Sequence, residues 1–243
     1  MNETYYVGAY WGCRPESAEA CARRAETFFR LLSACHPDYA RWYEKHNSVQ
    51  RALQLQFEPA YDTFVRFLGK KKYQAGRDGF LFGAWTGHRD NQGGMVTFSC
   101  GSEAETVPNN ALLYLPSEPP GWEHLVTLPV LTGVMRAMAL AWEPDWAVAT
   151  SDDLRGSLSQ KGAIGTFVGW LTYLSRQRGE VPALPRPVRV EPVEDKGTLL
   201  ILTPERLSAA HPEHVAFGQH VQRVLEERGL LRRVVAPPPA PVP

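Results

Sequence analysis

The stretch Tyr6-Val7-Gly8-Ala9-Tyr10-Trp11-Gly12 sets a glycine among aromatic residues in a strand-like run near the beginning of a 243-residue chain. The pattern recurs in Phe82-Gly83-Ala84-Trp85-Thr86-Gly87 and in Phe167-Val168-Gly169-Trp170-Leu171-Thr172-Tyr173. Glycine weakens a strand because it loses much backbone entropy and packs no side chain. Its repeated use beside large rings therefore predicts sheet positions where a ring or another backbone comes close. Such a sheet favours a binding surface over a catalytic centre.

Apolar spacing around these stretches predicts an α+β fold, in which helices pack on one face of an antiparallel twisted sheet. Helices are expected over 18–32, 37–43, 58–68, 127–142 and 212–228. Strands are expected over 5–11, 80–86, 95–100, 111–115, 145–150, 166–174, 188–193 and 198–203. Turn residues make 80–115 an antiparallel meander and 188–203 a hairpin, and 151–160 is expected to be a polar loop. Both halves order a helix beside a meander, which is compatible with two similar halves.

Composition predicts a globular chain with one core, because 44% of its residues are hydrophobic. We expect a single domain over 1–236 and a disordered proline-rich tail over 237–243. Lys+Arg and Asp+Glu both number 26, so no overall basic field argues for nucleic-acid or membrane binding. The chain begins Met1-Asn2-Glu3-Thr4 without a secretory signal and has no membrane-length apolar run, so we expect a cytoplasmic protein. In that compartment the four cysteines are expected to be reduced thiols.

Catalytic motifs are sparse. The sequence has no nucleophile elbow, no phosphate-binding loop and no dinucleotide fingerprint, so we predict neither a cofactor nor an enzyme. The alternative is a metal-dependent hydrolase that uses His211, His214 and His220, although Pro212 puts His211 at a helix start and the zinc-helix spacing is missing. Cys100 followed by Gly101 is interpreted as a core cysteine before a turn rather than a nucleophile. A third hypothesis is a scaffold protein whose proline tail docks in a partner's aromatic groove.

Charge is unevenly distributed along the chain. Between Gly101 and Gln160, eight acids are opposed only by Arg136 and Arg155. These acids are Glu103, Glu105, Glu118, Glu123, Glu143, Asp145, Asp152 and Asp153. Several follow predicted strands, where they could collect into a negative patch suited to a basic partner protein such as a nuclease. Lys70-Lys71-Lys72 is interpreted as the solvated end of a helix.

Several phrases along the chain resemble a known family. They are Tyr10-Trp11-Gly12-Cys13-Arg14-Pro15-Glu16-Ser17-Ala18-Glu19, Arg41-Trp42-Tyr43, Cys100-Gly101-Ser102, Val107-Pro108-Asn109, Val168-Gly169-Trp170-Leu171-Thr172-Tyr173-Leu174, Gly197-Thr198-Leu199-Leu200-Ile201-Leu202-Thr203-Pro204-Glu205 and Pro212-Glu213-His214-Val215. Together they resemble the immunity protein 52 family of bacterial polymorphic toxin systems. The similarity extends over nearly the whole chain except the proline tail. Its motifs are strand and turn phrases rather than catalytic signatures.

The resemblance implies a cytoplasmic α+β protein that is produced beside a toxin and neutralises it by direct binding without catalysis. It also implies a toxin delivered by a contact-dependent or type VI secretion route, frequently a nuclease. Trp11, Arg14, Trp170 and Glu205 fall on recurring positions of the family and could serve the fold or the interface. The toxin-binding residues that we predict are Glu103, Glu105, Asp152, Asp153, Trp85, Trp11 and Arg14.

Overall fold

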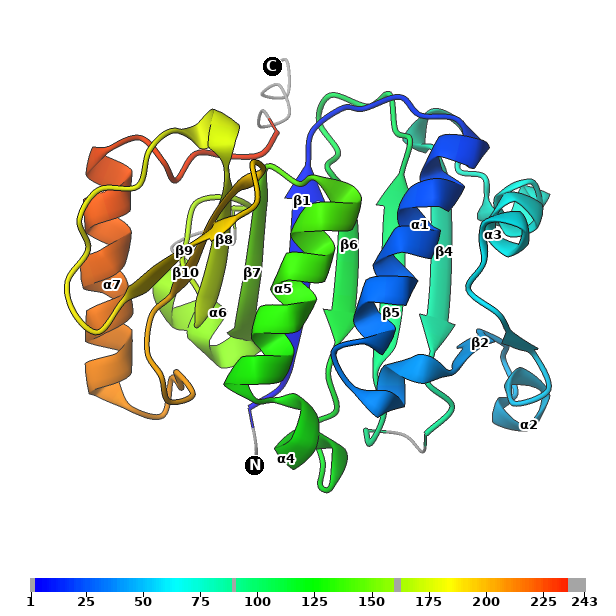
Figure 1. Ribbon diagram of the computed structural model, residues 1–243, viewed down its shortest axis with the longest axis horizontal. Coiled ribbons are helices and arrows are strands. Elements are labelled where there is room, and N and C mark those ends of the chain that lie inside the picture. Colours follow the sequence, from blue (N-terminus) through cyan, green and yellow to red (C-terminus); the bar gives the residue numbers. More distant parts are fainter. Residues whose placement is uncertain (1–2, 89–90, 160–162, 236–243) are drawn as a thin grey trace, which may run out of the picture.

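The computed structural model describes residues 3–88, 91–159 and 163–235, and over these residues the chain forms one ten-stranded antiparallel sheet (Figure 1). The strands are β1 (Tyr5–Trp11), β2 (Trp42–Glu44), β3 (Gln56–Phe57), β4 (Phe80–Trp85), β5 (Met95–Cys100), β6 (Asn109–Tyr114), β7 (Trp146–Ser151), β8 (Leu171–Ser175), β9 (Arg189–Val193) and β10 (Gly197–Ile201). Their order in the sheet is β3-β2-β4-β5-β6-β1-β7-β8-β10-β9. The predicted α+β class, the 80–115 meander and the 188–203 hairpin are confirmed.

Seven α-helices accompany the sheet over the same described residues. They are α1 (Ala18–Ser33), α2 (Val49–Ala52), α3 (Tyr61–Leu68), α4 (Gly121–Leu125), α5 (Leu128–Trp142), α6 (Asp152–Leu158) and α7 (Pro212–Glu227). None of the described helices has the length and apolar character that crossing a bilayer requires. The predicted tail over 237–243 lies outside the described residues.

The first face of the sheet is covered by α1, α3 and α5, which enclose an aromatic core (Figure 1). In this core the rings of Phe98 and Trp142 have centroids 5.0 Å apart, and those of Phe64 and Phe82 are 5.7 Å apart. The helix α1 begins after Ser17, whose hydroxyl accepts a hydrogen bond from the Ala20 N–H as an N-cap. Burial of this apolar surface is the main stabilising contribution to the fold.

The three glycine phrases meet three different neighbours. A Cβ on Gly8, in the central strand β1, would lie 2.7 Å from the Tyr10 ring, so a ring fills the space as predicted. A Cβ on Gly169 would lie 2.6 Å from the Ala149 carbonyl oxygen, which is the predicted close approach of backbone. At Gly83 the neighbour is instead the side chain of Lys45, whose Cδ would be 2.8 Å away.

Two predicted elements are wrong at their borders. The strand expected from residue 166 begins only at Leu171, because the Gly169 N–H donates to the Thr172 hydroxyl at 3.0 Å rather than to a neighbouring strand. The helical piece expected over 37–43 ends at Ala40, and extended backbone at Arg41 leads into β2, where Tyr43 pairs with Trp85.

The predicted polar loop over 151–160 is also wrong, because residues Asp152–Leu158 form α6. The Ser151 hydroxyl accepts from the Leu154 N–H at 3.1 Å, and two aspartates in the first turn favour the positive end of the helix dipole. The helix α6 contacts β7 and packs against α7, where Leu158 lies against Gly218. In Figure 1, α6 lies behind the strands while α5 lies in front of them.

The carboxylate of Glu3 ties the beginning of β1 to two distant segments. It accepts five hydrogen bonds, from the hydroxyls of Tyr5, Ser151 and Ser208 and from the N–H groups of Ala209 and Ala210. Burial raises the pKa of Glu3, but the hydrogen bonds from Ser208, Ser151 and Tyr5 outweigh burial, so the pKa is lowered. The Glu3 carboxylate therefore holds the beginning of β1 to the segment around Ser208, which lies more than 200 residues later in the sequence.

Replacing Glu3 with glutamine is expected to lower the free energy of unfolding at pH 7 by about 1–2 kcal/mol, because the amide cannot accept all five bonds and the site is partly solvated. The carboxylate pKa is lower in the folded chain than in the unfolded one. Its contribution is therefore present above about pH 4 and is lost as pH falls through the folded pKa. Denaturant unfolding at pH 7 and pH 3 should show the difference between the two proteins shrinking in acid. An equal difference at both pH values would contradict this role.

Candidate protein-binding surface

The strands β4, β5 and β6 alternate between side chains buried under the helices and side chains that are half-buried or exposed. By contrast, every residue of β7 and β8 is buried. The outward side of β4–β6 therefore lacks the cover that the rest of the sheet has. We call this side the open face and define it by Leu81, Gly83, Trp85, Met95, Thr97, Ser99, Asn110, Leu112 and Tyr114.

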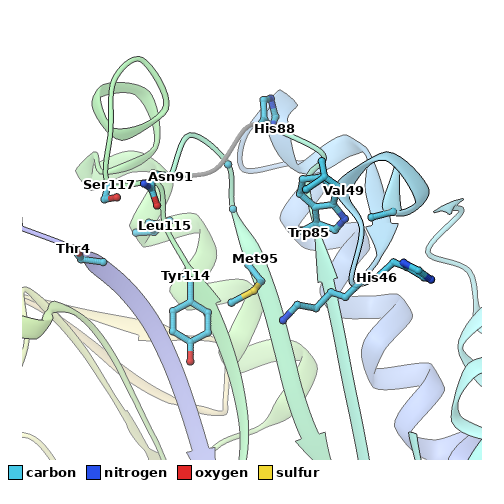
Figure 2. A pocket seen from close by; sticks show the side chains of 14 residues that line it. Thr4, His46, Val49, Trp85, His88, Asn91, Met95, Tyr114, Leu115 and Ser117 are labelled. Carbon is cyan, nitrogen blue, oxygen red and sulfur yellow. The ribbon is translucent and has the colours of Figure 1, made fainter. Parts of the chain in front are cut away.

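The register of the strands arranges the open face in rows that cross the strands. Trp85 pairs with Met95, and Met95 pairs with Tyr114, so these three large side chains form one row (Figure 2). The next row is Gly83, Thr97 and Leu112, which continues to Gly8 on β1. The two glycines of this row leave room for larger side chains, since the Tyr10 ring lies over Gly8 and the Lys45 stem lies over Gly83.

Two cavities open on this face. One of about 370 Å³ is lined by the Trp85 row together with Lys45, His46 and Val49 (Figure 2). The second, of about 320 Å³, is lined by Lys45, Lys72, Leu81, Gly83 and Thr97, among others. Of the six large apolar side chains that are exposed in the described chain, Val49, Leu81 and Tyr114 line these cavities. Clustered apolar exposure of this kind is typical of a binding surface.

No Asp or Glu is among the described residues that line either cavity, whereas Lys45 lines both. At the β1 border, burial raises the pKa of Tyr6, which Arg155 opposes and Asp152 reinforces, so α6 brings one charge of each sign beside the face. The side of β4–β6 away from the helices thus combines apolar and cationic groups.

Of the residues predicted to bind a toxin, Trp85 lies on the open face and Trp11 does not. Trp11 is only 2% exposed and stacks on Trp142 with ring centroids 5.5 Å apart. Arg14 covers the Trp11 ring at 4.8 Å and donates to the Trp142 carbonyl at 2.8 Å. Because Trp11 and Arg14 close the core at the end of α5, their observed contacts serve the fold.

The predicted acidic residues are exposed, but they do not gather. Glu103 and Glu105 follow β5 near the Trp11 end of β1, since Trp11 pairs with Asn109. Asp152 and Asp153 follow β7 near the Tyr5 end, since Tyr5 pairs with Ser151. Six residues of strand separate these ends, which is about 20 Å at the usual rise. The two acidic pairs therefore lie at opposite ends of the strands.

The groups weighed for catalysis have structural partners. The rings of His211 and His214 lie 4.9 Å apart, and the His214 Nδ1 accepts from the Ser208 N–H at 3.1 Å. Within the described ranges, no three His, Cys, Asp or Glu side chains are placed to share a metal ion, so His220 does not complete such a group. Cys100 is fully buried, and its hydrogen bond with Cys21 together with burial raises the pKa of the thiol.

The lysine run has a partner that sequence did not indicate. Lys70 and Lys72 both lie near the buried carboxylate of Glu44, at 3.9 and 3.3 Å, and the Tyr73 hydroxyl donates to the same carboxylate at 2.5 Å. Burial raises the pKa of Glu44, but Tyr73 and the two lysines outweigh burial and lower it. Two lysines of the run therefore share one buried carboxylate on β2.

Sequence reasoning missed most of the open face. Leu81, Met95, Tyr114 and Lys45 were not singled out, although large apolar residues recur at outward positions of the predicted meander. Alternation identifies two sets of side chains in each strand. Nothing in the strands themselves tells which set the helices cover, and Lys45 arrives from a segment outside the meander.

Comparison with known proteins identifies the family of this chain. The family model for immunity protein 52 matches residues 3–234. A solved structure of the Pseudomonas aeruginosa T6SS protein PA0821 is similar, with a TM-score of 0.54 and 11% identity over 96% of this chain and 78% of that one. At such identity the likeness concerns the fold alone. A search of curated proteins finds no match. The family match spans nearly the whole chain and confirms the resemblance read from the sequence, so this chain belongs to the immunity protein 52 family.

Proposed function

We propose that this chain is an immunity protein that binds a cognate toxin directly and neutralises it by covering the toxin's working surface, without catalysis. The observation that carries the proposal is the family match over residues 3–234. The fold shared with a T6SS protein supports a toxin delivered by that type of secretion system. We further propose that the toxin is a nuclease encoded nearby and that the complex forms in the cytoplasm.

We propose the open face as the centre of the interface. It offers large side chains on a rigid sheet, and such anchors lose little conformational entropy when a partner buries them. Trp85 is the sequence-predicted residue that belongs to this centre. The pair Glu103 and Glu105 and the pair Asp152 and Asp153 stay predicted toxin contacts, one at each end of the strands. The single variants Glu103→Lys and Asp153→Lys would test the two pairs separately.

A non-catalytic role is supported by the partners of the groups that could do chemistry. The Cys100 thiol is buried beside Cys21, and the His214 ring is held by Ser208. If the hydrolase alternative held instead, purified protein would carry stoichiometric zinc that His214→Ala removes. If the scaffold alternative held, deletion of the residues after Ala236 would abolish partner binding, whereas our proposal expects binding to be unchanged.

Co-expression tests the proposal. Cells that express the neighbouring toxin should survive when this chain is present in excess, because the two proteins form a complex that survives gel filtration. An unrelated toxin serves as the control and should kill equally with and without this chain. Killing by the cognate toxin at excess of this chain, with no complex on the column, would contradict the proposed function.

A further inference from the structure

Lys45 lies across the open face because Gly83 leaves room for it. A Cβ at position 83 would be 2.8 Å from the Lys45 Cδ and 3.6 Å from its Nζ. The same position is 3.6 Å from the methyl group of Thr97, on the next strand. The lysine stem therefore lies against the sheet at Gly83 while the side chain stays exposed, and Lys45 lines both cavities.

Of the two lysines that line these cavities in the described chain, Lys72 has an ion pair with a described residue and Lys45 has none. Lys70 and Lys72 share Glu44, and Lys196 pairs with Glu143 at 2.6 Å. Because Lys45 is exposed, a partner carboxylate can reach its ammonium, and apolar partner side chains packed beside the pair would exclude water and strengthen it. The open face thus presents, beside apolar side chains, a positive charge that has no ion pair with a described residue.

The apolar frame surrounds this charge on two sides. Leu81, which is 56% exposed, lies on the same strand two residues before Gly83. The row of Trp85, Met95 and Tyr114 lies on the other side, and its side chains are seen together in Figure 2. A partner that fits both features must carry apolar side chains next to at least one carboxylate.

We propose that the open face receives an acidic and apolar segment of the toxin, with a toxin carboxylate on the Lys45 ammonium and apolar toxin side chains on Leu81 and on the Trp85 row. This inference rests on the proposed function, since it names the partner chemistry of the same surface. Aromatic sheet faces with lysines also bind single-stranded nucleic acid. Zero net charge and the two lysines among the described residues that line these cavities give too little field for that, so a protein segment fits better.

Affinity for the purified neighbouring toxin, measured by calorimetry, tests the inference with substituted variants of the full chain. Lys45→Glu should weaken binding at least about 30-fold, because it sets a like charge against the toxin carboxylate. Arg30→Glu is the matched control, since it makes the same charge change at an exposed position of α1, on the helix-covered side. It should leave affinity within about twofold, because like charges more than a Debye length apart are screened.

Gly83→Ala separates the position of the lysine from its charge. The added methyl group displaces the flexible end of Lys45 and leaves the net charge unchanged. We expect a several-fold loss of affinity, and no further loss when Gly83→Ala is added to Lys45→Met, because both act through one contact. Thermal unfolding of each variant checks that the fold is intact.

The outcomes distinguish this inference from the function on which it rests. Unchanged affinity of Lys45→Glu for a toxin that the native chain binds would overturn the inference and leave the proposed function standing. Absence of toxin binding by the native chain would overturn both. Tight binding of a single-stranded oligonucleotide that Lys45→Glu abolishes, or a self-association that it abolishes, would assign the face to that other occupant and also overturn the inference.

Discussion

Replacing Arg178 with methionine is expected to lower the free energy of unfolding by about 3–4 kcal/mol, which corresponds to roughly 10 °C in Tm for a chain of this size. The guanidinium is 5% exposed and donates to four backbone carbonyls. These belong to Asp145, Gly165, Leu230 and Arg232. Methionine fills the volume but leaves these carbonyls without their donor.

The same contacts explain why the loss is large. They join the residues just after β8 to the segment before β8 and to the C-terminal segment after α7. These two segments are far apart in sequence. Burial, with the nearby Arg232, lowers the pKa of Arg178 to about 10, so it still carries its charge at neutral pH. Arg176→Met, two residues earlier and exposed, is the matched control and should change stability by less than about 0.5 kcal/mol. Similar denaturant midpoints for both variants would refute the assigned role.

Replacing Gly169 with alanine is the second change with a large expected effect, a loss of about 2–3 kcal/mol. The new Cβ would lie 2.4 Å from the Val148 Cγ2 and 2.6 Å from the Ala149 carbonyl oxygen, both on the central strand β7. Because backbone stands on one side, the clash cannot be relieved by a side-chain rotation alone. The segment that leads into β8 must then move away from the sheet.

Gly156→Ala provides the matched control for this substitution. Gly156 lies within α6, and a Cβ there meets nothing within 4 Å. Alanine is the better helix former, so this variant should be neutral or more stable by up to about 1 kcal/mol. In urea unfolding, the free energies of unfolding of the two variants should therefore change in opposite directions from the native value, or differ from each other by more than about 2 kcal/mol. A Gly169→Ala protein as stable as the native chain would contradict the close approach to β7.

The sequence predicts most of the sheet because local signals agree there. Alternating apolar residues and the turn residues 90–94 and 195–197 define the meander and the hairpin, and Thr127 before Leu128 starts α5. Local signals fail where contacts with a segment distant in sequence determine the secondary structure. Pro37 favours a helical start, but Trp42 pairs with Phe57 on β3 and Tyr43 pairs with Trp85 on β4, so both become strand residues. The short helix α6 was not predicted because its N-cap residue, Ser151, is also the last residue of β7.

The open face was less predictable for the same physical reason. Sequence reasoning chose both Trp85 and Trp11, because an aromatic residue beside a glycine has the same pattern in the core and at the surface. A negative patch was a hypothesis because several acids follow strands, whereas the register puts the loop after β5 and the loop after β7 at opposite ends of the strands. Lys45 reaches the open face only because Gly83 has no side chain, a relation between two segments that no local pattern contains.

The central claim, that this chain neutralises a toxin by covering it with the open face, is tested most directly by hydroxyl-radical footprinting of the complex. Radicals readily oxidise accessible Met, Trp and Tyr side chains. We predict that oxidation of Met95, Trp85 and Tyr114 falls when the neighbouring toxin is bound, while Tyr61 on α3, on the helix-covered side, is unchanged. Unchanged oxidation of all three open-face residues in a complex whose formation is verified would contradict the account.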